Sequence, residues 1–93
     1  MAQEVIKRDG SRQLFDARKI SNAIMAAGAE TDLSDDKVNE AIERVTTVVS
    51  QMVEARDEIT TTEIRERVLS ELDAMAPAIA EAWRKYDKQQ KEI

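Results

Sequence analysis

Five basic side chains near the start of this 93-residue chain are its strongest candidates for chemistry. They are Lys7, Arg8, Arg12, Arg18 and Lys19. A helix predicted to begin just after Asp16 would add free backbone N–H groups, which attract anions at the start of a helix. The spacing therefore predicts a corner that holds a phosphate. The alternative is an ordinary solvated face, which is common for charged side chains.

The composition excludes the most familiar kinds of catalysis. The chain has no cysteine and no histidine, so thiol chemistry, histidine-based triads, disulfides and the usual zinc sites are ruled out. Its two glycines, Gly10 and Gly28, cannot form a glycine-rich phosphate loop. The acidic pair at positions 35 and 36 is expected in the first turn of a helix, where negative charge is favourable. The sequence predicts a protein that is not an enzyme and has no metal site.

The charge is unevenly distributed along the chain. The net charge is −5, but residues 1–20 and 84–93 each carry +2, whereas residues 21–83 carry −9. An acidic body with basic ends favours a small anion site where the ends meet, and it makes nucleic acid an unlikely partner. Because neither a signal peptide nor a spanning segment is visible, the expected location is cytoplasmic, with no membrane partner.

The basic corner is expected to sit on a short hairpin followed by helices. Val5-Ile6 and Leu14-Phe15 flank Asp9-Gly10, a dipeptide typical of a two-residue hairpin turn with positive φ at both central positions. Hydrophobic residues then recur at spacings of three and four. The predicted elements are a hairpin over 4–15 and helices over about 17–27, 35–55, 61–75 and 77–90. The fold class is α+β, mostly α: a β-hairpin over a four-helix bundle, in one domain covering residues 1–93.

Local signals mark where these helices begin and end. Good N-cap residues precede three of them: Asp16, Ser34 and Thr60. Thr60 and Glu63 have the spacing of a capping box, and Pro77 fits the first turn of the last helix. Gly28 is expected to end the first helix as its C′ residue. The segment from 55 to 58 is predicted as a break between helices.

The opening of the chain resembles that of the ATP-cone domain, a small nucleotide-binding regulatory module best known at the N-terminus of ribonucleotide reductases. The resemblance rests on Val-Ile-Lys-Arg-Asp-Gly-Ser-Arg at 5–12, then Phe15-Asp16, Lys19-Ile20 and Ala23-Ile24. Two weaker matches are Ile-Thr-Thr-Thr-Glu-Ile at 59–64 and Ala-Glu-Ala-Trp-Arg-Lys-Tyr at 80–86. The likeness covers nearly the whole chain, and its first motif is the most specific.

The resemblance implies that the hairpin and the first helix enclose an adenine nucleotide, ATP or dATP, as an effector with Mg²⁺. The implied phosphate-binding residues are Lys7, Arg8 and Lys19, with Lys88 or Lys91 from the last helix. The implied base and ribose pocket consists of Val5, Phe15, Asp16, Ile20, Thr61 and Ile64. The hydroxyl of Thr61 would lie beside the adenine.

The function implied is that of a non-catalytic regulatory domain that controls the activity or assembly of ribonucleotide reductase, in cis as an excised domain or in trans. Its partners would be reductase subunits or another copy of itself. The related transcriptional repressor of reductase genes carries the same cone behind a cysteine zinc ribbon, and the lack of cysteine argues against that identity. The alternative from another class is a helical protein-interaction module that binds no nucleotide.

Overall fold

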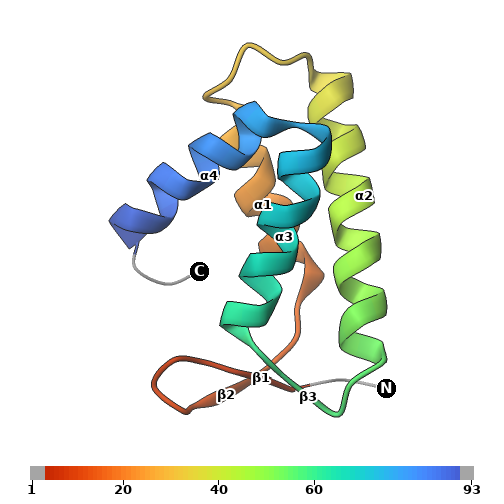
Figure 1. Ribbon diagram of the computed structural model, residues 1–93, viewed down its shortest axis with the longest axis vertical. Helices are drawn as coiled ribbons and strands as arrows, with labels where there is room; N and C mark the ends of the chain where they lie inside the picture. Colours follow the sequence, from red (N-terminus) through yellow and green to blue (C-terminus); the bar gives the residue numbers. More distant parts are fainter. Residues whose placement is uncertain (1–3, 91–93) are drawn as a thin grey trace.

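The computed structural model describes the backbone of residues 4–90 and the side chains of residues 4–85. Two strands come first, β1 (Glu4–Ile6) and β2 (Arg12–Leu14), followed by α1 (Ala17–Gly28) and α2 (Asp35–Glu54). A third strand, β3 (Glu58–Thr60), leads into α3 (Thr61–Met75) and α4 (Pro77–Gln90). Figure 1 shows the strands at one end of the helices and the α1–α2 loop at the other. The predicted α+β fold, a hairpin followed by four helices, is confirmed.

The three strands form one small sheet in the order β2-β1-β3. β1 pairs with β2 in antiparallel fashion, with Val5 opposite Gln13, and with β3 in parallel fashion, with Val5 opposite Ile59. The third strand is absent from the sequence prediction, which placed a break between helices there. Three residues are too few to display an alternating pattern. Ile59 is extended because it pairs with a distant strand and is only 2% exposed.

The turn of the hairpin differs from the predicted two-residue turn. The N–H of Gly10 donates to the carbonyl of Lys7 (2.9 Å), and the N–H of Lys7 donates to the carbonyl of Ser11 (2.8 Å). The loop therefore contains three residues, Arg8, Asp9 and Gly10, and Gly10 closes it at φ +87°. Asp9 adds local support because its Oδ1 accepts from the N–H and the hydroxyl of Ser11.

The end of α1 also corrects the sequence prediction. Gly28 is the last residue of the helix and is buried, and Ala29, not Gly28, follows as the cap. A Cβ at Gly28 would lie 2.8 Å from Cγ1 of Val38. Gly28 is therefore needed for the close approach of α1 to α2, where a larger residue would collide with Val38.

The other predicted helix ends are confirmed within a residue. Thr60 Oγ1 accepts from the N–H of Glu63 (3.1 Å), and Glu63 Oε1 accepts from the N–H of Thr60 (3.0 Å), which completes the capping box. Pro77 is the first residue of α4, where its missing N–H costs no hydrogen bond. α2 ends at Glu54, one residue before the predicted end.

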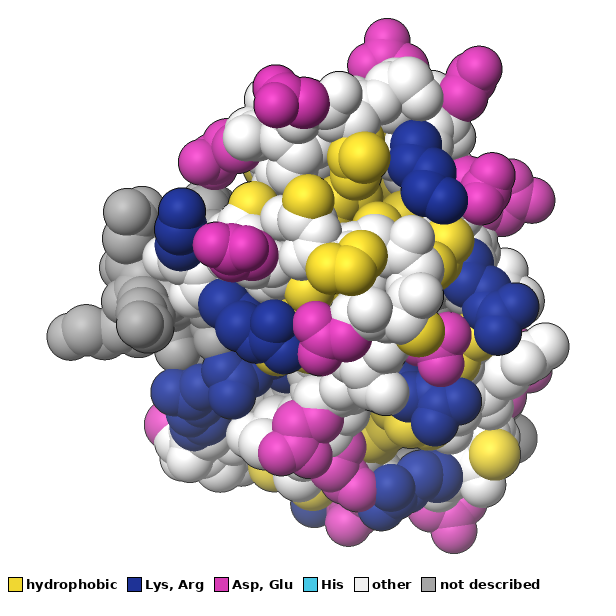
Figure 2. Space-filling model, turned by 45° about the horizontal axis from the view of Figure 1, so that its top comes forward, with side chains coloured by type: hydrophobic (Ala, Val, Ile, Leu, Met, Phe, Trp, Pro, Cys, Tyr) yellow, Lys and Arg dark blue, Asp and Glu magenta, His cyan; other side chains and the backbone are white. Residues whose placement is uncertain are grey.

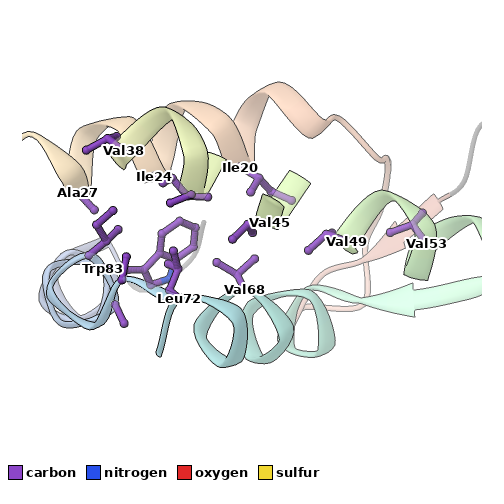
Figure 3. Close-up of a cluster of buried hydrophobic side chains, with 14 of the residues drawn as sticks. Ile20, Ile24, Ala27, Val38, Val45, Val49, Val53, Val68, Leu72 and Trp83 are labelled. Atoms are coloured by element: carbon purple, nitrogen blue, oxygen red, sulfur yellow. The ribbon is translucent and has the colours of Figure 1, made fainter. Parts of the chain in front are cut away.

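The four helices enclose an aliphatic core (Figure 3). Eight of its residues are fully buried, with 0% exposure: Ile24, Ala41, Val45, Val49, Val68, Leu72, Ile79 and Ala80. Trp83 joins them from α4. No polar or charged residue is buried among the described part of the chain. None of the described helices is long and apolar enough to cross a membrane.

Candidate ligand-binding site

A pocket opens where the hairpin, α1, α3 and α4 meet. It contains about 500 Å³ of space when the open solvent at its mouth is included. Seven residues of the predicted site line it: Val5, Phe15, Asp16, Lys19, Ile20, Thr61 and Ile64. The fold therefore brings residues of the opening motif and residues of the 59–64 motif together around one pocket.

The pocket is also lined by five residues that the site prediction did not include. They are Gln13, Leu14, Arg65, Val68 and Trp83. Val68 lies one helical turn after Ile64, so its spacing alone was sufficient to place it on the same face of α3. Val68 and Trp83 are both buried in the hydrophobic core. A buried side chain can belong to the core and to the floor of a pocket at once, and nothing in the sequence distinguishes the two.

The pocket divides into an apolar floor and a polar mouth. Val5, Ile20, Val68 and Trp83 form the floor, and each is 5% exposed or less. The exposed side chain of Lys19 lies at the mouth. A flat apolar group fits the floor, because a charged group would lose its hydration there without a partner. Negative charge fits the mouth.

Lys19 is held at the mouth by its position in the first turn of α1. Its backbone N–H donates to the carbonyl of Asp16 (3.1 Å), and its Nζ lies 3.4 Å from Oε1 of Gln13 on β2. The N-terminus of α1 and the ammonium group therefore present positive charge on the same side of the pocket.

Asp16 lines the pocket, but its carboxylate has a structural partner. It caps α1 by accepting from the N–H of Arg18 (3.0 Å), and it pairs with the Arg18 guanidinium (3.2 Å). The Arg18 side chain holds the pKa of Asp16 below its ordinary value. The carboxylate consequently stays ionised at neutral pH and fixes the start of the helix that carries Lys19.

The parallel pairing of β3 with β1 brings the start of α3 to the pocket. Thr61 is the first residue of α3 and follows Thr60, the N-cap, directly. Arg12 connects all three strands, because its guanidinium lies 2.8 Å from Glu58 and 3.4 Å from Glu4. Thr61 is therefore positioned by a backbone ladder and an ion pair, both outside the pocket.

Two predicted phosphate-binding residues, Lys7 and Arg8, are described and are not among the residues that line the pocket. Lys7 directly precedes the hairpin loop and Arg8 is its first residue, next to the strands that form one wall. The side chain of Lys88, and Lys91 as a whole, lie outside the described residues. A phosphate role for these four remains a prediction.

The charge on the opposite end of the molecule has the other sign. The α1–α2 loop and the start of α2 carry Glu30, Asp32, Asp35 and Asp36. Figure 2, in which this end is turned toward the reader, shows acidic side chains along the upper edge and, below it, most of the Lys and Arg with further Asp and Glu among them. An anionic ligand is therefore favoured at the hairpin end.

One polar atom of a residue that lines the pocket is itself buried without a partner in the described part of the chain. Trp83 is 3% exposed, and its indole Nε1 has no hydrogen-bond acceptor among the described residues. A buried donor left without an acceptor costs about 1–3 kcal/mol. Folded proteins rarely retain such a donor unless a water or a ligand completes it.

Comparison with known proteins matches nearly the whole chain to one family. The family profile described as the ATP cone domain covers residues 3–92. A transcriptional repressor NrdR of Carboxydothermus hydrogenoformans is 35% identical over 68 residues, which is 73% of this chain and 43% of the repressor. The repressors NrdR of Lactobacillus helveticus and Thermotoga neapolitana are 34% and 35% identical over the same length, 43% and 42% of their own. The chain thus spans less than half the length of the curated relatives it matches.

These relatives bear on two of the sequence predictions. They are transcriptional repressors, the class that the lack of cysteine had argued against for this chain. The sequence similarity is confined to the aligned residues, which are less than half of each repressor. They also give no support to the prediction that nucleic acid is an unlikely partner.

Proposed function

This chain belongs to the ATP cone domain family, and we propose that it is a non-catalytic regulatory domain whose effector is ATP or dATP. The observation that carries the proposal is the pocket, in which seven residues implied by the resemblance surround an apolar floor with a cationic mouth. That division matches the two parts of a nucleotide, an apolar flat base and a highly charged triphosphate.

In the proposed complex the base occupies the floor and the triphosphate extends to the mouth. Lys19 and the start of α1 would meet the phosphates first, and Lys7 and Arg8 would reach them from the hairpin loop. A triphosphate carries roughly three to four negative charges, and each charge-assisted hydrogen bond contributes about 1.5–3 kcal/mol. Three cations are therefore sufficient to offset most of the charge.

The proposed Mg²⁺ would be held by the nucleotide itself. The described residues contain no cluster of three or more Asp, Glu, His or Cys side chains that could bind an ion. Mg²⁺ commonly keeps several waters and binds through phosphate oxygens. We therefore assign no protein ligand to it.

The proposed regulation concerns ribonucleotide reductase. The nucleotide would act either on the assembly of the enzyme or, as the named relatives suggest, on transcription of its genes. In both cases ATP or dATP must bind two assembly states unequally, because a ligand with equal affinity for both shifts nothing. The regulated partner would be a reductase subunit, a DNA-bound repressor or a second copy of this domain.

The first test is the melting temperature with Mg²⁺ and each of four ligands: ATP, dATP, GTP and tripolyphosphate. A ligand at 100 times its Kd stabilises by about 2.7 kcal/mol, which raises Tm by several degrees in a domain of this size. We expect a larger rise with ATP or dATP than with GTP. The absence of any rise would overturn the proposal and favour the protein-interaction module.

Three variants separate the two parts of the site. Lys19→Ala should weaken ATP and tripolyphosphate at least tenfold, about 1.4 kcal/mol. Lys37→Ala is the matched control, because Lys37 pairs with Glu40 at the far end of the molecule, and it should leave both affinities unchanged. Thr61→Val should weaken ATP and leave tripolyphosphate unaffected. Equal losses in the two lysine variants would mean that charge acts without a site.

A further inference from the structure

The outward face of α1 differs from that of the other three helices. Exposed residues follow one line along α1 and its cap, at spacings of four, three and four: Arg18, Asn22, Met25 and Ala29. This is the spacing by which one helix packs along another. Residues 20–29 contain no charged side chain, whereas α2, α3 and α4 each carry exposed charged side chains along their length. Because a helix face in contact with water is normally charged or strongly polar, the composition of this face is typical of a packing surface.

Met25 is the large hydrophobic residue of this face. It is 54% exposed, and among the described large hydrophobic residues only Leu14 of the hairpin is more exposed. Beside Met25 a hollow opens between α1 and the start of α2, and Gly28, Leu33 and Val38 are among its lining residues. The same face thus presents an exposed apolar side chain and, next to it, a hollow with partly apolar walls. A surface with both features can be complementary to itself, which a contact between two identical subunits requires.

The two ends of this face carry opposite charges. The Arg18 side chain at the start of α1 is 88% exposed although it pairs with Asp16, and Glu30, just after the helix, is exposed as well. We propose that the outward face of α1 binds the same face of a second copy of this chain, with the two α1 helices antiparallel about a twofold axis. Each Arg18 then lies near the partner's Glu30, and the two Met25 side chains lie close to the axis. A parallel arrangement would bring like charges together, which is unfavourable.

The expected dimer is weak, because the contact is small. α1 has 12 residues and is therefore about 18 Å long. Stable interfaces bury about 800 Å² on each partner, which is more than one helix face of this length covers. Asn22, Met25 and Ala29 are not among the residues that line the nucleotide pocket. The inference therefore goes beyond the function proposed above, and the self-association does not depend on nucleotide binding.

Sedimentation velocity of the chain without nucleotide, at concentrations up to about 1 mM, measures this association. The unmodified protein should shift from monomer toward dimer as its concentration rises. Met25→Glu should weaken the association at least tenfold, because a carboxylate at the contact would lose its hydration. Gln51→Glu is the matched control, since it adds the same charge at an exposed position of α2 and should leave the association unchanged.

Exchange of the two charges tests the antiparallel orientation. Arg18→Glu and Glu30→Arg should each weaken the association, and both changes suit the helix dipole, so the variants should fold. The double variant should associate about as strongly as the unmodified protein, because each pair across the contact again has opposite charges. Its net charge is also that of the unmodified protein, so a general charge effect cannot explain the recovery. A double variant that associates no better than the single variants would overturn the proposal.

Two further results would also overturn it: a protein that stays monomeric at about 1 mM, and equal association of Met25→Glu and Gln51→Glu. Should Met25→Glu not fold, the charge-exchange variants still decide. The nucleotide function is tested separately, because ATP should raise the Tm of Met25→Glu as much as that of the unmodified protein. If no nucleotide raises either Tm, the nucleotide function fails and the association result stands.

Discussion

The helical core and the hairpin corner of this protein differ in how completely their side chains are shielded from water. In the core, side chains from all four helices exclude water almost completely, and no described polar or charged residue is buried there. In the corner, strands of only three residues support a pocket with an exposed lysine, an exposed leucine and a buried indole N–H without an acceptor. The core is closed to solvent, whereas the corner is partly open to it.

The difference teaches that stability and recognition depend mostly on separate residues. Burial of one large aliphatic side chain stabilises a protein by about 1.5–3 kcal/mol. An exposed ion pair such as Arg12–Glu58 contributes about 0–1 kcal/mol. Changes in the core should therefore lower stability, and changes at the mouth should lower affinity. Four buried residues belong both to the core and to the pocket lining, so a change there should affect stability and affinity together: Val5, Ile20, Val68 and Trp83.

The largest effect on stability is expected from Leu72→Ala. Leu72 is fully buried between α3 and its neighbours, and such truncations cost about 2–5 kcal/mol because a cavity remains. Leu14→Ala is the matched control, since Leu14 is 63% exposed and should cost less than about 0.5 kcal/mol. Denaturant unfolding of both variants measures the contrast. Similar losses would mean that the corner is as important for stability as the core.

A smaller loss is expected from Gly28→Ala at the contact of α1 with α2. Overpacking against Val38 should lower the free energy of unfolding by about 1–3 kcal/mol, and the better helix propensity of alanine should raise it by about 0.5–1 kcal/mol. The net expectation is a loss of about 1 kcal/mol with unchanged nucleotide affinity. Adding Val38→Ala should make the Gly28→Ala change neutral or favourable. If the two losses simply add, the helices are not in close contact at Gly28.

Thr60→Ala tests the boundary between the two regions. Loss of an N-cap costs about 1 kcal/mol, and here it also loosens the first turn of α3, which carries Thr61. We therefore expect both lower stability and weaker ATP binding. Thr62→Ala, one residue beyond Thr61 and exposed, should change neither. Calorimetric titration with ATP and thermal melts of both variants provide the comparison, and an unchanged ATP affinity in Thr60→Ala would show that the cap does not position Thr61.

The smallest effect is expected from acid pH. The backbone N–H of Thr60 holds the pKa of Glu63 below its ordinary value of 4.5, and the Arg84 side chain holds that of Asp73 below 3.8. The unfolded chain then binds more protons than the folded one in this range. Stability from these groups is complete above about pH 5 and is lost as the pH falls through the lowered values. Melts from pH 6 to pH 2 should show a shallower decline for Asp73→Asn, and an identical slope would contradict the linkage.

The sequence predicted the parts of the molecule that short-range forces decide. Helix ends followed from capping residues and proline, because these act within one turn of their own position. The basic corner followed from residues close together in the chain, and the seven lining residues were implied by the family resemblance of two motifs, at 5–20 and 59–64. Two predictions failed because the partner was distant: β3 was missed, and Gly28 was assigned to a cap instead of a helix contact. The hairpin register was also shifted by one residue, although its turn is local.

The sequence by itself thus determined the number of helices, their order and the cluster of basic residues near the start of α1. Only the tertiary structure decided that β3 pairs with β1, that α4 closes the pocket, and that the Trp83 N–H lacks an acceptor among the described residues. The physical reason is the range of the interactions. Caps and turns are satisfied by neighbours in sequence, whereas a pocket floor and an unsatisfied donor exist only once distant segments pack together.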